Sequence, residues 1–126
     1  MKIRDINIDF KDNRGTISDL FYDEKINHVA DIRTYKACIR GNHYHKKTTQ
    51  HIFVYKGFLE YWYKKLNSNE EPKKIIVNEN QIVSTPPLEI HALKITTINY
   101  FIVFATGQRG GKDYESDTFR VEPIIL

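Results

Sequence analysis

Short runs of β-branched and aromatic residues, separated by turn residues, dominate the hydrophobic pattern of this chain. Apolar residues rarely recur at the three- and four-residue spacing that is typical of a helix. The pattern instead predicts a series of short strands. We expect them over residues 2–10, 15–21, 29–39, 41–45, 51–57, 58–66, 73–79, 81–85, 90–97 and 99–106.

Turn residues fall between these strands. Gly, Pro, Asn or Asp occurs where each bend needs one, over residues 11–15, 55–57, 67–72, 78–80 and 84–87. Short strands at this spacing favour an antiparallel sandwich or barrel, and the chain length suits one core. We therefore expect a single all-β domain over residues 1–126, with a C-terminal flap at about residues 107–126.

Two of the expected strands are apolar on both faces. Phe58, Tyr61, Trp62 and Tyr63 cannot all point into one core, and the same holds for the run over residues 99–105. A strand that is buried on both sides needs a second cover, either the flap or another subunit. We expect a homodimer; scattered surface aromatics are the alternative.

Composition and charge narrow the possible partners. The formal net charge is only +3 and the lysines are scattered, which argues against a nucleic-acid partner but suits a phosphorylated small molecule. One cysteine, Cys38, excludes an internal disulfide and suits a reducing compartment. The N-terminal residues lack the apolar core of a signal peptide, and no apolar stretch is long enough to span a membrane. We expect a cytoplasmic protein without a membrane partner.

The histidines form the main candidate for chemistry. His43 and His45 are separated by one residue, so in an extended strand both imidazoles share a face. A tight turn at residues 46–49 would place Gln50 on the same face of the neighbouring strand. His91 starts a later strand, five residues after Pro86. The other two histidines lie outside this pattern, and we interpret them as surface or packing residues: His28 and His51, the latter pointing away from the face of Gln50.

These intervals resemble the two halves of the cupin signature, which are Gly, His-x-His, Glu and Gly, and then Pro, Gly, His and Asn. Gln50 stands in place of the glutamate, Leu88 in place of the second glycine and Ile95 in place of the asparagine. The resemblance covers about residues 40–95. It implies a cupin jelly-roll β-barrel in which four side chains converge at the barrel mouth: His43, His45, Gln50 and His91.

Three interpretations of this group are open. Three neutral imidazoles can hold Zn, Fe, Ni or Mn, although Gln50 offers only an amide oxygen where a carboxylate is usual. The four metal-ligand candidates would then be His43, His45, Gln50 and His91. A second interpretation is a purely structural polar interior, which requires a buried partner for each histidine. The third is proton transfer without a metal or another cofactor.

A narrower resemblance supports proton transfer. Arg40, Gly41, His43-Tyr44-His45, Lys46 and Gln50 are similar to the motif of RmlC-like cupins that act on nucleotide-linked 4-keto-6-deoxy sugars. In the 3,4-ketoisomerases that motif is Arg-Gly-x-His-x-His-Lys followed by Gln, and in the 3,5-epimerases it is Arg-Gly-x-His-Tyr-Gln. The second histidine places this chain nearer to the ketoisomerases. Two flanking segments also resemble these enzymes, through Asp12, Arg14 and Gly15 and through Tyr114, Asp117 and Arg120.

The resemblance implies a role for each candidate residue. His43 would be the base that removes a proton next to the sugar carbonyl, and His45 would move the second proton. Tyr114 is a candidate acid, and Asp117 a candidate partner of the base. The developing enolate needs a donor, and a diphosphate needs forked guanidinium groups. The substrate-binding candidates are Arg14, Arg40, Gln50, His91 and, for nucleobase stacking, Tyr35.

The sequence thus predicts a nucleotide-sugar isomerase or epimerase of the ketoisomerase kind, acting in the synthesis of surface-polysaccharide precursors. Its expected partner is a nucleotide-linked sugar, and no cofactor is expected. The alternatives are a metal-dependent cupin enzyme and a cupin that binds a sugar without catalysis.

Overall fold

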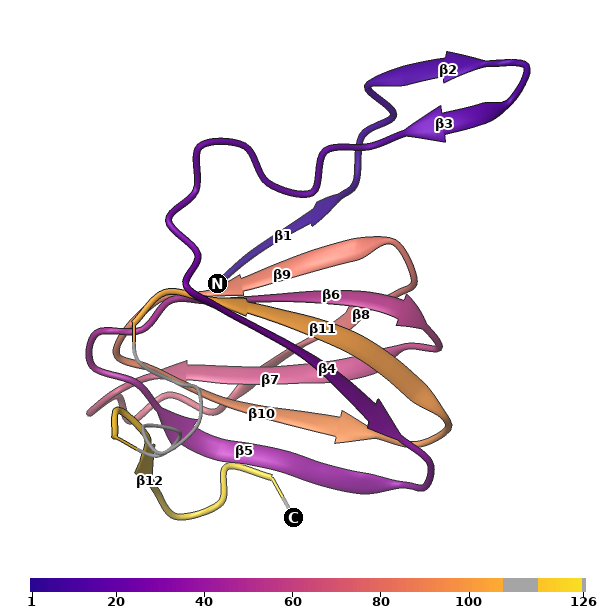
Figure 1. Cartoon of the computed structure of the whole chain (residues 1–126). Helices are drawn as coiled ribbons and strands as arrows, with labels where there is room; N and C mark the ends of the chain where they lie inside the picture. Colours follow the sequence, from indigo (N-terminus) through magenta and orange to yellow (C-terminus); the bar gives the residue numbers. More distant parts are fainter. Residues whose placement is uncertain (108–115, 126) are drawn as a thin grey trace.

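Over residues 1–107 and 116–125, which the computed structural model describes, the chain consists of β-strands and turns without a helix. Figure 1 shows two curved sheets that face each other, with a hairpin projecting from one end. Every strand pair is antiparallel. This part of the chain contains no helix long and apolar enough to cross a membrane.

Each sheet has five strands. The first sheet has the order β1 (Lys2–Asp5), β9 (Gln81–Thr85), β6 (Gln50–Lys56), β11 (Asn99–Ala105) and β4 (His28–Thr34). The second has the order β12 (Phe119–Arg120), β5 (Cys38–Tyr44), β10 (Glu89–Ile95), β7 (Leu59–Lys65) and β8 (Lys73–Val77). The projecting hairpin pairs β2 (Phe10–Asp12) with β3 (Gly15–Ile17).

The core lies between the two sheets. Alternate residues of β11 point inward, and Phe101, Val103 and Ala105 are all buried. Each large apolar side chain that is fully buried in this way contributes about 1.5–3 kcal/mol. The cluster continues across both sheets through Ile52, Val54, Leu59, Tyr61, Val77, Val83, Leu93 and Ile95.

Several details of the predicted strands are wrong. The expected strand over residues 2–10 ends at Asp5, with β2 starting at Phe10, and the expected strand over residues 15–21 ends at Ile17. The expected strand over residues 29–39 is two strands, β4 and β5, which belong to different sheets. The histidine strand β5 and the Gln50 strand β6 are therefore not neighbours. They lie in opposite sheets and direct their side chains toward each other across the barrel, because the turn between them carries the chain from one sheet to the other.

Phe104 and Trp62, aromatic residues of β11 and β7 that lie outside the core, are partly covered by other residues of the same chain. Phe21, which precedes β4, packs against Phe104 with ring centroids 4.7 Å apart. The ammonium of Lys74 lies 5.5 Å from the ring centroid of Trp62, and the indole Nε1 donates to Glu60. Part of the second cover that these strands need is thus supplied by the N-terminal segment and by one lysine.

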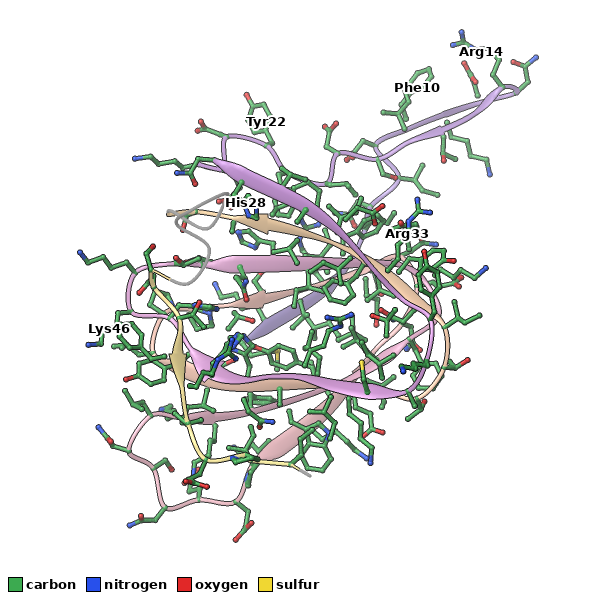
Figure 2. The ribbon with its side chains drawn as sticks, turned by 60° about the horizontal axis from the view of Figure 1, so that its bottom comes forward. Phe10, Arg14, Tyr22, His28, Arg33 and Lys46 are labelled. Atoms are coloured by element: carbon green, nitrogen blue, oxygen red, sulfur yellow. The ribbon has the colours of Figure 1, made fainter. Side chains whose placement is uncertain are left out.

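The β2–β3 hairpin and the C-terminal segment are the irregular parts of the molecule. The hairpin extends away from the barrel, with Phe10 and Arg14 far from the sheets (Figure 2). At the other end of the chain, residues 116–125 run along the edge of β5, where β12 pairs with it (Figure 1). The rest of the expected flap, residues 108–115, lies outside the described residues.

Candidate active site

Three imidazoles meet inside one end of the barrel. The ring centroid of His43 lies 4.9 Å from that of His45 and 4.7 Å from that of His91. The centroids of His45 and His91 are 5.4 Å apart. His45 and His91 are buried and His43 is half-buried, so the cluster is shielded but can be reached from outside.

A β-bulge directs the histidines of β5 into the barrel. The register between β5 and β10 shifts next to His91, and Asn42 adopts a φ of 57° there. Gly41 has a φ of 92°, and a Cβ at this position would lie 2.8 Å from the carbonyl oxygen of His91. Only glycine allows such a close approach of the two backbones, which explains the Arg-Gly pair before the histidines.

Backbone carbonyls fix two of the imidazoles. His45 Nδ1 lies 2.7 Å from the carbonyl oxygen of Asp117, and His91 Nδ1 lies 3.2 Å from the carbonyl oxygen of Glu89. A carbonyl oxygen can only accept a hydrogen bond, so both Nδ1 atoms carry hydrogen. In a neutral ring, Nε2 is then the nitrogen with the lone pair, the form in which imidazole takes up a proton or binds a cation.

A cavity of about 340 Å³ opens beside the cluster. Inward side chains of β11, β6 and β10 form its apolar wall. The polar lining comes from both sheets and from the C-terminal segment, and consists of Arg40, His43, Gln50, His91, Thr118 and Arg120. An apolar wall opposite a few converging polar groups is typical of a small-molecule site.

Two of the predicted binding residues are held at this cavity. Gln50 is buried at the start of β6, in the row formed with Ala105 and Thr85 across the first sheet. Arg40 Nε donates a 3.2 Å hydrogen bond to Thr34 Oγ1, which orients its guanidinium at the rim. The positively charged side chain of Arg40 at the rim and the amide of Gln50 inside the cavity suit a ligand with one anionic end and one polar, uncharged end.

Behind His91 lies a buried polar group that the sequence did not reveal. The Tyr61 hydroxyl donates to Glu89 Oε1 at 2.9 Å and lies 2.6 Å from Thr85 Oγ1. The ring of Tyr61 is parallel to that of His91. Burial, with the Glu89 charge beside it, raises the pKa of Tyr61 far above its ordinary value. Tyr61 is therefore a neutral hydrogen-bond donor that supports the strand of His91.

Asp117 is near the cluster, but not as a carboxylate partner of a histidine. Its side-chain oxygens accept hydrogen bonds from the amides of Lys46, Lys47 and Thr48 and from Thr48 Oγ1. Burial alone would raise the pKa of this carboxyl, yet the hydrogen bonds together hold it below its ordinary value. Asp117 was expected to pair with the base, His43; the histidine contact seen here is instead between its backbone carbonyl and His45.

Four of the predicted site residues line the cavity: His43, His91, Gln50 and Arg40. His45 joins them through the imidazole cluster but is not itself a lining residue. The structure does not bring Arg14 or Tyr35 to the same cavity. Arg14 lies at the tip of the hairpin, where it pairs with Asp12 and its side chain is 82% exposed. Tyr35 is 68% exposed and packs edge-on against Tyr100. Tyr114 lies outside the described residues.

Sequence reasoning missed Thr118 as a lining residue and gave Arg120 no role of its own. β12 pairs Arg120 with His43 in register, and this pairing brings both residues to the cavity. A two-residue strand carries almost no periodic signal, so only the weak resemblance around Asp117 pointed to this segment.

The arrangement of the three histidines is also typical of a metal site. One ligand atom from each of His43, His45 and His91 lies within 4.8 Å of the others. Carbonyls that fix the second nitrogen of His45 and His91 are the usual outer partners of metal-binding histidines. The residues present therefore fit a divalent metal, with Gln50 as a neutral oxygen donor in place of the usual carboxylate.

Comparison with solved structures identifies the architecture. QdtA, a sugar 3,4-ketoisomerase from Thermoanaerobacterium thermosaccharolyticum solved with TDP, is similar with a TM-score of 0.75 and 21% identity, over 95% of this chain and 87% of that one. A 3,4-ketoisomerase from Helicobacter canadensis gives 0.76 and 22%, over 95% and 90%. The dTDP-4-dehydrorhamnose 3,5-epimerase from Sulfolobus tokodaii gives 0.69 and 21%, over 86% and 70%. The expected all-β, RmlC-like cupin fold is confirmed.

Comparison of the sequence with protein-family models assigns the chain to a family. No curated protein matches the chain by sequence. The family model described as "Polysaccharide biosynthesis C-terminal domain" matches residues 10–119, which is most of the chain. This chain belongs to the polysaccharide biosynthesis C-terminal domain family.

Proposed function

We propose that this protein is a nucleotide-sugar isomerase that moves protons on a 4-keto-6-deoxy sugar with its histidines. The observation that carries the proposal is the group of three imidazoles with ring centroids 4.7–5.4 Å apart, beside a cavity whose rim holds Arg40. Ketoisomerases and epimerases of such sugars are among the proteins with this fold, including one solved with TDP. The family assignment to polysaccharide biosynthesis agrees with this chemistry.

The reaction needs a base and a second proton carrier within reach of one another. The hydrogen on C3 of a 4-keto sugar is acidic because the C4 carbonyl stabilises the resulting enolate. In the proposal His43 removes that hydrogen and returns a proton to O4, which gives an enediol. His45 then accepts the proton of the O3 hydroxyl and delivers one to C4, so that the carbonyl forms at C3. Histidine suits both steps because its ordinary pKa lies near neutrality.

The remaining residues bind the substrate. Gln50 faces the cavity and would donate from its amide to the enolate oxygen, where a developing negative charge gains most from fixed donors. His91 also lines the cavity, and the lone pair on its Nε2 would accept a hydrogen bond from a substrate hydroxyl. Arg40 and Arg120, which both line the cavity, would bind the diphosphate, because guanidinium groups pair with phosphate oxygens in a fork.

Deuterium exchange in two histidine variants tests these roles. TDP-4-keto-6-deoxyglucose is incubated with each protein in deuterated water, and ring protons are followed by NMR. His43→Asn should slow exchange at C3 by about 10²–10⁴-fold, the usual contribution of a general base. His45→Asn should slow formation of the 3-keto product more than it slows exchange at C3.

A histidine outside the cluster provides the matched control. His51 lies on the opposite face of β6 from Gln50, bonded to Ser84, so His51→Asn should exchange like the wild type. The assigned role of His43 is wrong if His43→Asn also exchanges at the wild-type rate. Binding of the sugar nucleotide without exchange by the wild type would indicate a sugar-binding cupin instead.

A metal-dependent cupin enzyme is the second candidate, because the three histidines and their two carbonyl partners fit a divalent cation. His43, His45 and His91 would hold it, and the cation would polarise the substrate carbonyl. Metal analysis of the purified protein, followed by exchange measurements after chelator treatment, separates the two candidates. Full exchange by chelated protein excludes the metal-dependent mechanism.

The proposal also includes a homodimer. Phe10 and Ile17 in the β2–β3 hairpin, and Ile8 just before it, are each more than half exposed. An isolated two-stranded hairpin is marginally stable in water, so packing of these apolar residues against a second copy supports the predicted dimer. Arg14 does not line the cavity and projects from the hairpin tip away from the sheets (Figure 2), so it would reach a substrate only in the site of the partner.

A further inference from the structure

The C-terminal segment is tied to the histidine cluster at one residue, Asp117, which the proposed chemistry does not use directly. We infer that Asp117 is a positioning residue, which holds the turn after His45 with its carboxylate and sets the protonated nitrogen of His45 with its carbonyl. The catalytic consequence of this inference rests on the proposed function; the structural part does not.

The side-chain oxygens of Asp117 accept hydrogen bonds from the turn that follows His45. Oδ1 accepts from the amide of Lys46 at 2.9 Å. Oδ2 accepts from the amides of Lys47 and Thr48 and from Thr48 Oγ1, each also at 2.9 Å. A carboxylate offers about four acceptor positions. Four donors from three consecutive residues thus converge on this carboxylate, which fixes the path of the turn from the second sheet to the first.

The backbone carbonyl of the same residue faces the other way, toward the cluster. It accepts the hydrogen bond from Nδ1 of His45 at 2.7 Å. His45 is 1% exposed, so water does not compete for that nitrogen. The side chain and the carbonyl thus act as one clamp, because the four bonds to the turn determine where the carbonyl stands.

The segment after Asp117 extends this connection along β5. The Val121 amide donates to the carbonyl of Asn42 at 3.1 Å, and the Ile124 amide donates to Asn42 Oδ1 at 2.9 Å. Thr118 and Arg120, which lie between Asp117 and Val121, line the cavity. Asp117 therefore fixes the beginning of a segment that both completes the cavity wall and orients a histidine.

The consequence for chemistry is a defined starting state for His45. With hydrogen on Nδ1, the neutral ring has its lone pair on Nε2, and this nitrogen can exchange protons with a ligand. Loss of the clamp would free the ring to populate both tautomers. The site would then lose activity through misorientation, although no group that contacts substrate had been removed.

Imidazole nitrogen NMR tests the clamp without any reaction. In protein labelled with ¹⁵N-histidine, long-range proton–nitrogen spectra identify which ring nitrogen carries hydrogen, and His45→Asn assigns the signals. The wild type should show His45 protonated at Nδ1. Asp117→Ala should give a mixture of tautomers. Asp117→Asn keeps one acceptor oxygen and should lie between the two.

Activity measurements on the same proteins test the catalytic consequence. We expect Asp117→Ala to slow deuterium exchange by about 10–100-fold with little change in KM, and Asp117→Asn to recover part of this loss. Glu122→Gln, which removes an exposed carboxylate from the same segment, is the matched control and should behave as the wild type in both measurements. If Asp117→Ala does not fold, Thr48→Val removes a single bond of the clamp and should produce a smaller change of the same kind.

Two results would overturn the inference. The first is a wild-type His45 that carries its proton on Nε2. The second is an Asp117→Ala protein in which His45 keeps a single Nδ1–H tautomer and exchange is unaffected. A wild type that shows the expected tautomer but exchanges no substrate proton would contradict the proposed function while leaving the clamp in place, so the two failures are distinguishable.

Discussion

Leu88 illustrates how single residues near the histidines carry strain. Its φ is 68°, in the left-handed region where a side chain costs about 1–2 kcal/mol. The amide of Leu88 donates to the carbonyl of His45 at 2.7 Å, so this turn holds the end of the His-x-His segment. Glycine occupies the corresponding place in the cupin signature, and the backbone explains why.

Replacement of Leu88 by glycine should therefore stabilise the protein. Leu88 is half exposed and loses little packing, while the relief of strain exceeds the entropic cost of glycine. We expect the free energy of unfolding to rise by about 0.5–1 kcal/mol in urea denaturation. Leu88→Ala keeps a Cβ and serves as the control; a glycine variant no more stable than the alanine variant would show that no strain is relieved.

Tyr61 is the second residue for which the structure makes a quantitative prediction. Tyr61→Phe removes the hydroxyl that Glu89 and Thr85 share inside the barrel. A buried acceptor left without its donor costs about 1–3 kcal/mol, so the free energy of unfolding should fall by that amount. Tyr63→Phe, half-buried on the same strand, is the matched control. Equal stability of the two variants would contradict the assigned role of Tyr61.

At the scale of elements, β6 presents different chemistry on its two faces. Gln50 points into the barrel, whereas His51 points outward, as its position in the strand predicts. His51 is buried there against Phe21, with ring centroids 4.8 Å apart, and its Nδ1 lies 2.7 Å from Ser84 Oγ. Burial lowers the pKa of His51 below its ordinary value.

This lowered pKa gives the stability of the fold a pH dependence of known sign. As the pH falls through the ordinary histidine pKa, the unfolded chain takes up a proton at His51 before the folded chain does. The free energy of unfolding should therefore decrease from about pH 8 to about pH 5. His51→Gln should reduce this decrease, as measured by urea denaturation at each pH. An identical decrease in the variant would exclude His51 as its source.

The sequence predicted which residues form strands better than it predicted how the strands pair. Runs of β-branched and aromatic residues between turn residues marked β6, β9 and β11 correctly, because such side chains pack well in a sheet. It could not show that the turn after His45 crosses between sheets, since that depends on Asp117, far along the chain. The histidine spacing predicted the cluster because one-residue separation fixes a shared face. Glu89 and Tyr61 were missed because neither belongs to a spacing motif.

At the scale of the whole molecule, the projecting hairpin is the feature that a monomer does not explain. Phe10→Asp combined with Ile17→Asp should convert the proposed dimer to a monomer, because the charges would have to be buried at the interface. Sedimentation measurements at several concentrations check this. Tyr22→Asp, exposed outside the hairpin, is the control and should remain dimeric. A wild type that sediments as a monomer would rule out the dimer.

The central claim is that the imidazole cluster transfers protons on a 4-keto sugar. The most direct measurement is deuterium incorporation by the wild-type protein at the carbons next to the carbonyl of TDP-4-keto-6-deoxyglucose, followed by NMR in deuterated water. Rapid loss of the C3 proton signal, together with appearance of a 3-keto product, is the expected result. A substrate that binds but keeps its C3 proton, at the rate of the protein-free solution, would contradict it.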